Sequence, residues 1–534
     1  MTPVVMPDQI ELAQLEAPAG VCVRRRSWRD VSRLAVHPLL RNVGLTGLAS
    51  LVTSLAAVVV ISLIGRTVGP VLLGEYLLLR RMASWLQAVV VLPSGIALPR
   101  YVAASVDDSA SRQTYFLGAV VTSCGLALLL TAILVLWKIP VGRLIFGSAE
   151  LAPLTLPLGL LLLGLAAHGA AFGFYQGTLS MGRACTMQVF NLAVFPVLVV
   201  VLLARERSIS LIIGATGIAM TVCALVFSIP IFGELRWAHV APRAWKHVSE
   251  LLWFGLSRAW GDFGLQALLG LPAVIAAHYV PMRSVGFLLL GGSLLSVVSA
   301  ATLPLGIILL SHVTRALAQG RAADLRDPLA HFADALIGSS FFVSLQMLVF
   351  ADVIIRIWVG PDFAAATGVV RLLIVAVPFY FVYGGLRSVV DAAAVKAHNT
   401  RNILISLAVF LVTVAAVRVG PFHASLLAGL AVSVVVSMAV LCWLTLKTMQ
   451  ELFQLRVSWG QFLVSAGFAG ILGAASFLLH SVLRFQPNFA ILALYELAVS
   501  GAYFTALWLF GSPWLRFSMQ AMFSAQWSRP EPVQ

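Results

Sequence analysis

Long apolar runs follow one another along nearly the whole chain, and each is about long enough to cross a lipid bilayer. About 20 apolar residues span the hydrocarbon core as a helix, and a backbone in lipid must satisfy its hydrogen bonds internally. The sequence therefore predicts an all-α polytopic membrane protein with about fourteen transmembrane helices. These are 43–64, 82–98, 114–136, 154–174, 186–203, 211–232, 251–277, 285–310, 335–355, 369–386, 402–417, 425–446, 462–483 and 490–510.

The composition excludes a soluble globule, because 60% of the 534 residues are hydrophobic and only 10% are charged. The net charge of +14 is spread over short loops. That distribution is typical of loops that face anionic membrane lipids, so no nucleic-acid partner is expected. The five cysteines form no CxxC pair, and they indicate neither a metal site nor a disulfide framework.

Three short motifs recur in the same order, which indicates an internal duplication of about 213 residues. The matches are Arg26–Leu34 with Arg243–Leu251 at an offset of 217, Val68–Gly74 with Val280–Gly286 at 212, and Arg143–Gly147 with Arg356–Gly360 at 213. One such match could arise by chance among Leu- and Val-rich segments, but three in order at one offset are much less expected. In a polytopic membrane protein the repeat predicts two lobes around a central path.

This duplication divides the chain into four parts. They are a cytoplasmic tail with a basic amphipathic segment (1–40), an N-lobe of six helices (41–235), a C-lobe of six (236–450), and two extra helices with a cytoplasmic tail (451–534). An even helix count places both termini on one side. With the termini inside, 22 of the 35 Lys and Arg residues are cytoplasmic and 11 are outside, as the positive-inside rule favours. Six of the 22 belong to the N-terminal segment, so the orientation rests partly on it.

The sequence carries none of the motifs that bind nucleotides or catalytic metals. It has four lysines and no GxxxxGK[ST] motif, and both HExxH and GxGxxG are absent. We therefore expect no ATP hydrolysis, no cofactor and no metal site. An ion gradient or the gradient of the substrate itself must then drive the protein.

Several motifs resemble the polysaccharide transport family of flippases, which belongs to the multidrug/oligosaccharidyl-lipid/polysaccharide exporter superfamily. They cover residues 40 to 450 and are GRTVGPVLLGEYLLLRRMASWLQAVVVLPSGIALPRYVAA, RLIFGSAELA, FYQGTLSMGRACTMQVFNL, LLWFGLSR and IIRIWVGPDFAAATGVVRLLI. Lipid II flippases and multidrug and toxin exporters share the two-lobed plan. One departure is Leu271-Pro272, where members of the family often have Asp-Arg.

This resemblance implies transport of a polyprenyl-diphosphate-linked oligosaccharide from the inner to the outer leaflet of the bacterial plasma membrane. Such transport serves lipopolysaccharide or exopolysaccharide assembly. It also implies membrane lipids as surroundings, and a polysaccharide polymerase and export machinery as possible partners.

Charged residues inside one apolar segment provide the leading candidate site. Arg258 and Asp262 are four residues apart, hence on one helix face, and Gln266 continues that face. A charge in a spanning helix costs roughly 2.5–3.5 kcal/mol on insertion scales, so it normally faces a partner or a polar cavity. Arg258 could grip a diphosphate with two donors, with Asp262 as its partner in the empty cavity. Alternatively, Arg258 extends back to the cytoplasmic surface with Asp262 as its counter-ion.

Other polar residues have a binding interpretation and a structural one. Asn42 and Thr46 begin a polar stripe with Ser50, Thr53 and Ser54, which either lines a cavity or bonds its own backbone. His168 and Gln176 lie beside glycines at 169, 173 and 177. That spacing predicts close helix packing, and His168 is either an interior residue or a proton-coupling group. Arg80 and Arg81 are expected to begin the second helix at the outer face, where they attract the diphosphate or anchor the helix.

Three functions compete on these observations. The first is the flippase. The second is a cation-coupled multidrug and toxin antiporter, a function that usually requires buried acidic groups, whereas Asp262 is the one clear intramembrane carboxylate here. The third is a polytopic enzyme acting on the same lipids, which requires a sizeable outer loop, and no outer loop exceeds about 17 residues. We predict a flippase and no enzymatic activity.

Overall fold

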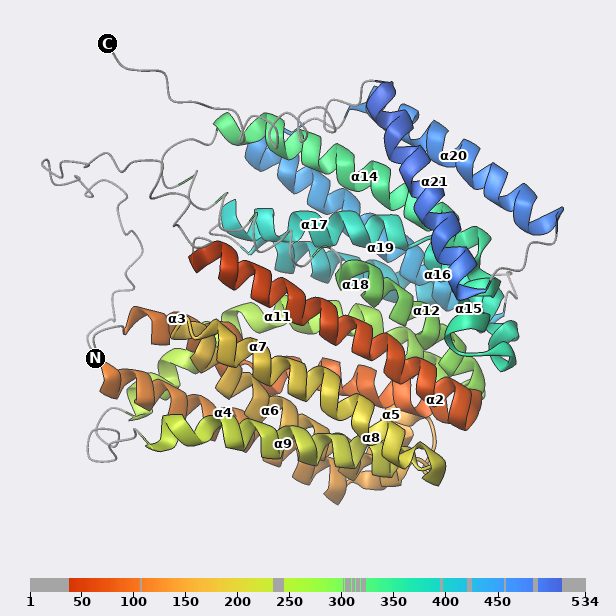
Figure 1. The fold of residues 1–534 in the computed structure, drawn as a ribbon. Coiled ribbons are helices and arrows are strands. Elements are labelled where there is room, and N and C mark those ends of the chain that lie inside the picture. Colours follow the sequence, from red (N-terminus) through yellow and green to blue (C-terminus); the bar gives the residue numbers. More distant parts are fainter. Residues whose placement is uncertain are drawn as a thin grey trace, which may run out of the picture. The chain divides into compact units, whose positions relative to one another are not determined.

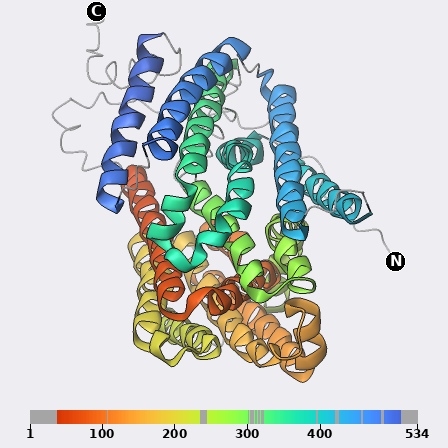
Figure 2. The same ribbon diagram turned by 90° about the vertical axis from the view of Figure 1, so that its right-hand side faces the viewer.

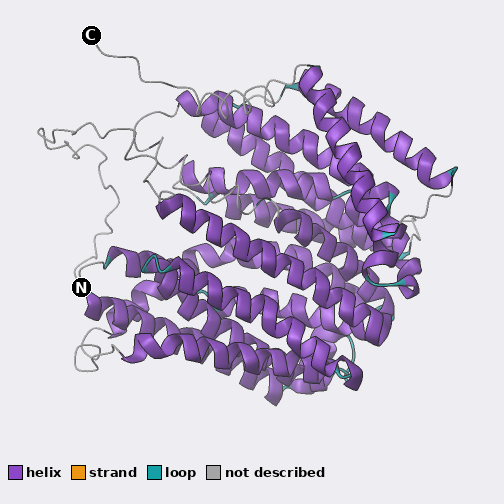
Figure 3. Ribbon diagram, in the orientation of Figure 1, coloured by secondary structure: helices purple, strands orange, loops and turns teal. Residues whose placement is uncertain are grey.

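The computed structural model describes residues 38–105, 108–233, 244–300, 323–393, 397–419, 425–455, 458–483 and 488–510, with 302, 309, 313 and 317. The chain separates into two units, Met1–Asn42 and Val43–Gln534, and the fold below is that of the second unit. Its described residues form helices and connecting turns, with no strand among them (Figure 3). The predicted all-α class is therefore confirmed.

The first group of helices corresponds to the predicted N-lobe. Its elements are α2 (Pro38–Val90), η1 (Pro93–Ala97), α3 (Leu98–Ala104), α4 (Ser109–Leu136), α5 (Lys138–Phe146), η2 (Ala152–Leu154), α6 (Thr155–Gly177), α7 (Met181–Val189), η3 (Phe190–Val194), α8 (Phe195–Leu203), η4 (Ala204–Glu206) and α9 (Ile209–Gly233). Helices α4 and α9 both pack against α6 (Figure 1).

The second group covers the predicted C-lobe and the C-terminal region. Its elements are α11 (Ala244–Ala277), α12 (Met282–Ala300), η5 (Ala323–Leu325), α14 (Arg326–Val349), α15 (Ala351–Trp358), η6 (Pro361–Ala366), α16 (Thr367–Ile374), α17 (Val377–Ala393), α18 (His398–Val419), α19 (Leu426–Phe453), α20 (Trp459–Ser481) and α21 (Phe489–Leu509). Helices α18 and α19 pack together, α11 packs on α18, and α20 packs on α14.

Helix α2 contains two of the predicted spans. Gly69 divides it, because its φ of 85° and ψ of −178° are not helical. A side chain at this φ would be strained, whereas glycine adopts it readily. Pro70 then begins the second helix, a position that suits proline because its missing N–H would have no partner there.

Among the described residues, eleven helices are long and apolar enough to span a membrane, or twelve if the bent pair α16–α17 is one span. That number takes α2 as one helix and omits the shorter apolar helix 282–298. With these differences, each of the fourteen predicted segments has a described helix at its place. Large apolar side chains remain exposed on many helices, as expected where lipid surrounds the protein.

The glycines of α6 confirm the predicted close packing. A Cβ built on Gly169 would lie 3.1 Å from the Ser94 hydroxyl, and one on Gly173 would lie 2.6 Å from the Ser94 carbonyl. A Cβ on Gly177 would lie 2.7 Å from Val102. Since real Cβ atoms do not approach so closely, these glycines allow α6 to touch η1 and α3.

Candidate functional site

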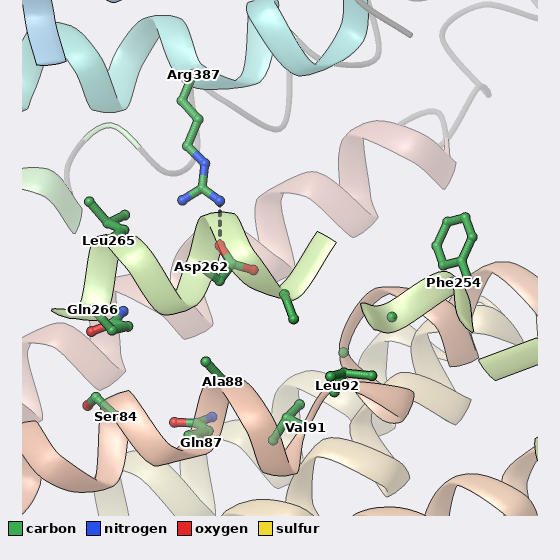
Figure 4. Close-up of a pocket in the computed structure, with 13 residues that line it drawn as sticks. Ser84, Gln87, Ala88, Val91, Leu92, Phe254, Asp262, Leu265, Gln266 and Arg387 are labelled. Atoms are coloured by element: carbon green, nitrogen blue, oxygen red, sulfur yellow. Dashed lines mark hydrogen bonds and ion pairs between the residues drawn. The ribbon is translucent and has the colours of Figure 1, made fainter. Parts of the chain in front are cut away.

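A cavity of about 290 Å³ lies between helices of the two groups (Figure 4). Its walls come from α2 and η1 on one side and from α11 and α17 on the other. The lining residues are Ser84, Gln87, Ala88, Val91, Leu92, Gly95, Phe254, Gly255, Ala259, Asp262, Leu265, Gln266 and Arg387. A cavity between the two predicted lobes is where a transporter of this plan would hold its substrate.

Helix α11 reaches the cavity because small residues let it approach its neighbours. A Cβ on Gly255 would collide with the backbone of Leu92, in the turn between α2 and η1. From this contact onward, one face of α11 presents Asp262, Gln266 and Gly270 at intervals of four residues. Figure 4 shows Asp262 and Gln266 on the same helix, with Ser84 and Gln87 on the helix opposite.

The charged centre of the cavity is an ion pair that joins α11 to α17. The Arg387 guanidinium donates through Nη2 to Asp262 Oδ1 at 2.6 Å (Figure 4). Arg387 Nε lies 3.8 Å from Asp391 Oδ2, four residues further along α17. The Asn399 amide donates to the Arg387 carbonyl at 3.0 Å and to Asp391 Oδ1 at 2.7 Å. Thus α11, α17 and α18 all hold the position of this guanidinium.

The ion pair is accessible from the cavity. The Arg387 side chain is 35% exposed and that of Asp262 is 45% exposed. Neither charge is fully desolvated, so an incoming anion can compete with the carboxylate for the guanidinium without a large penalty for separating the pair.

Sequence reasoning missed Arg387. The predicted span ended at Leu386, which placed Arg387 just outside the membrane, whereas α17 continues to Ala393. The i, i+4 spacing of Arg387 and Asp391 was the available local signal. Its pairing with Asp262, 125 residues away, is a tertiary contact that no local pattern indicates.

Arg258 lies one turn before Asp262 on α11, and its side chain is outside the described part of the structure. Its pairing with Asp262 and its contact with a diphosphate therefore remain predictions. Asp262 and Gln266 both line the cavity, and their contact with a substrate stays a prediction.

Arg80 and Arg81 do not begin the second helix, and this expectation is wrong. That helix starts at Pro70, so both residues are about ten residues inside it, roughly 15 Å at 1.5 Å per residue. Arg80 Nη1 donates to the Tyr76 hydroxyl at 3.4 Å and lies over the Tyr76 ring.

Arg81 faces α11 and α12. Its Cγ would be 3.3 Å from a Cβ on Gly270, and its Nη2 would be 3.8 Å from one on Gly292. The half-buried Arg81 side chain makes no hydrogen bond or ion pair with any residue that the structure describes. The glycines on both neighbouring helices leave room for this uncompensated guanidinium beside the polar face of α11.

Of the remaining predicted residues, Thr46, His168 and Gln176 do not line the cavity. Thr46 accepts a weak bond from the Cys185 thiol on α7 at 3.9 Å. Asn42 ends the first unit and is not placed relative to the cavity. His168 is buried, with Nδ1 3.1 Å from the Asn191 amide, and Gln176 is half-buried on α6. His168 is thus an interior residue, and its role in proton coupling stays a prediction.

Two hydroxyls of the predicted polar stripe on α2 bond to the backbone of their own helix. Thr53 and Ser54 both donate to the Ser50 carbonyl, at 3.0 and 2.8 Å. Such bonds to the preceding turn satisfy a hydroxyl within its own helix.

Comparison with solved structures shows which known proteins share this fold. No family model matches the chain, and no curated protein matches it. A solved structure of the lipid II flippase MurJ in an inward closed conformation is similar, with 15% identity, a TM-score of 0.66, and coverage of 87% of this chain and 98% of that one. The eukaryotic MATE transporter AtDTX14 has 15% identity and a TM-score of 0.56, with 80% and 98% covered.

An inward-facing multidrug resistance MATE transporter of the MOP superfamily has 13% identity and a TM-score of 0.57, with 79% of this chain and 95% of that one covered. At these identities the similarity shows a shared fold alone. The chain therefore has the all-α polytopic fold found in MurJ and in MATE transporters.

Proposed function

We propose that this protein is a flippase that moves a polyprenyl-diphosphate-linked oligosaccharide across the bacterial plasma membrane. The two predicted lobes (41–235 and 236–450) would expose the cavity to each side in turn. The observation that carries this proposal is a pair of arginines beside the polar face of α11, Arg387 in the lining of the cavity and Arg81 on α2. Asp262 is already paired with Arg387, and Arg81 stands nearby without a counter-ion among the described residues. Such a site favours an anionic substrate.

A diphosphate can replace the carboxylate at Arg387. The guanidinium is planar, stays charged, and can donate two hydrogen bonds to phosphate oxygens. Asp391 and Asn399 continue to hold the arginine when Asp262 is displaced. Asp262 then serves, beside Asp391, as the anion that occupies the Arg387 guanidinium when no substrate is bound.

The position of Arg81 provides a second place along the path where the diphosphate can bind. Gly270, which Arg81 approaches, is eight residues beyond Asp262 on the same face of α11, roughly 12 Å along the helix. Gln266 lies between them and can donate hydrogen bonds to the phosphates as they pass. The polar face of α11 therefore connects two cations at different depths, Arg387 and Arg81.

In this proposal both termini are cytoplasmic and the carrier receives its substrate in the inner leaflet. It delivers the substrate to a polymerase and export machinery for exopolysaccharide or lipopolysaccharide assembly. The protein itself makes and breaks no covalent bond. Because the sequence has no nucleotide motif, an ion gradient or the substrate gradient supplies the energy.

The alternative is a cation-coupled multidrug and toxin antiporter. The similarity to MATE transporters and the carboxylate of Asp262 in the cavity support it. In that case Asp262 would hold the cationic drug or the coupling ion, and Arg387 would be its counter-ion in the empty state.

Deletion of the gene separates the two functions. A flippase predicts that a polyprenyl-linked oligosaccharide accumulates on the inner leaflet, identified chemically after extraction, and that plasmid-borne protein reverses the accumulation. An antiporter predicts unchanged lipid-linked glycans and increased sensitivity to cationic compounds. The second outcome would refute the proposal.

A further inference from the structure

Two short helices at one end of the bundle make equivalent contacts between the two groups of helices. Helices α5 and α15 are both followed by a glycine with positive φ, Gly147 at 72° and Gly360 at 105°. They lie near the same end of the bundle, which Figure 2 views (Figures 1 and 2). The offset of 213 residues that relates Arg143–Gly147 to Arg356–Gly360 relates these two helix ends.

Each helix end packs on the opposite group. A Cβ on Gly65 of α2 would lie 3.0 Å from Val359, directly after α15. A Cβ on Gly147, directly after α5, would collide with the Ala277 carbonyl at the end of α11. Gly65 and Ala277 are themselves 212 residues apart. We call the contact of α15 with α2 the first seam, and the contact of α5 with α11 the second seam.

The first seam is closed by side chains. Trp358 is only 8% exposed, and its Nε1 donates to the Val58 carbonyl at 2.8 Å. Ser62 donates to the Trp358 carbonyl at 2.5 Å. Arg66 donates to the carbonyls of Ile357 and Trp358. One aromatic side chain and three donors therefore hold this seam shut.

At the second seam, the positions of Trp358 and Arg66 are taken by residues of other kinds. Ile145 occupies the position of Trp358, and His278 that of Arg66, at the same offsets. His278 does not reach across the seam with Nδ1, which lies 2.8 Å from the Val274 carbonyl of its own helix. A groove of about 570 Å³ remains between α5, α11 and α18. Its walls include Leu144, Leu411 and Ala415, and His278 and Tyr279 contribute to its lining.

The surroundings of the groove identify its occupant. Its walls on α11 and α18 lie within or directly beside the segments long and apolar enough to span a membrane. Leu144 is 70% exposed and Leu411 is 49% exposed, so the groove opens to hydrocarbon. A groove of about 570 Å³ is large enough to take one acyl chain.

The neighbouring charge favours an anionic headgroup. Arg143 precedes Leu144 on α5, is exposed, and makes no ion pair with the residues that the structure describes. We propose that the groove at the second seam binds an anionic phospholipid of the bilayer, with one acyl chain against Leu144 and Ala415 and the phosphate near Arg143 and His278. The lipid then fills the seam that Trp358 fills on the other side. This proposal does not depend on which substrate is transported.

Photo-crosslinking of the full-length protein in vesicles tests the site. The probe is phosphatidylglycerol with a diazirine near the end of one acyl chain, compared with phosphatidylcholine carrying the same group. Labelled peptides are mapped by mass spectrometry. We expect labelling around Leu144 and Ala415 to exceed that at Val201 of α8, which is exposed to lipid and corresponds to Val414 at the offset of 213. Phosphatidylglycerol should label the groove roughly fivefold more than phosphatidylcholine, since one basic residue near the headgroup gives about that preference.

Matched variants separate a bound lipid from general contact with the bilayer. Ala415→Trp fills the groove and Ile145→Trp restores an indole at the seam, so each should abolish the excess labelling. Val201→Trp, the control, should leave it unchanged, and Arg143→Gln should remove the headgroup preference only. Groove labelling no higher than at Val201, or unaffected by both tryptophan variants, would overturn the proposal. So would displacement of the label by added polyprenyl phosphate, which would identify a polyprenyl chain as the occupant.

Discussion

Replacement of Arg387 by alanine tests the proposed anion site most directly. A hydrogen bond to a charged group contributes about 1.5–3 kcal/mol. Loss of the guanidinium should therefore weaken the binding of a diphosphate roughly 10- to 150-fold, since 1.4 kcal/mol is a factor of ten. The effect on folding should be smaller. Both side chains of the pair are more than a third exposed, so the pair contributes about 1 kcal/mol or less to stability.

Three further variants test which feature of the site determines the affinity for the diphosphate. Arg387→Lys keeps the charge but loses the two-donor geometry, so it should bind with intermediate affinity. Asp262→Asn removes the competing carboxylate, and the affinity for a diphosphate should be unchanged or higher. Asp391→Asn removes the second carboxylate beside Arg387, which is 3.8 Å away and does not line the cavity, so it should weaken binding less than Arg387→Ala does.

The assay is binding of a short-chain polyprenyl diphosphate to the purified protein. Complementation of a deletion strain is measured in parallel, with each variant checked for membrane abundance. Wild-type affinity in Arg387→Ala would refute the anion site. Loss of transport in Asp262→Asn with wild-type diphosphate binding would indicate instead that the carboxylate holds a cation.

Four other outcomes can be checked. Cysteines placed at Ser148 and Asp362 should react with an impermeant reagent added outside, and one at Gln319 should not; the reverse pattern would invert the topology. The purified protein should transport in vesicles without ATP, and strict ATP dependence would contradict this. Arg258→Lys should fold but transport poorly if Arg258 grips the diphosphate, whereas an arginine that only reaches the membrane surface predicts normal transport. Gly217→Ala should lower the thermal stability by about 1–3 kcal/mol, measured by melting, because its Cβ would lie 2.5 Å from the Leu160 backbone.

The helices could be predicted from the sequence because every apolar segment that crosses lipid must satisfy its backbone hydrogen bonds within itself. It was weaker where a helix is shielded from lipid by the protein. Glu75 and the two arginines at 80 and 81 lower the hydropathy of 70–81, and this stretch was therefore predicted as a loop. It is helical from Pro70 because Leu73, Leu77 and their neighbours are buried inside the bundle, where polar residues can face other helices.

The candidate site could be predicted only in part, for a related reason. The spacing of Asp262 and Gln266 is local, and a helix converts it into a shared face. The partner of Asp262 comes from α17, and the choice among distant arginines depends on how α11, α17 and α18 pack. Periodicity carries no information on that choice.

The pairing of Arg387 with Asp262 also bears on how the membrane potential acts on the carrier. A neutral pair moves no net charge when the empty cavity changes sides, so at this pair the return step is insensitive to voltage. A bound diphosphate adds negative charge to the moving part. With a negative cytoplasm, each elementary charge carried outward across the full field gains about 2.3 kcal/mol per 100 mV. Under the proposed orientation, the resting potential would accelerate loaded export, whereas the Arg387–Asp262 pair would add no voltage dependence to the empty return.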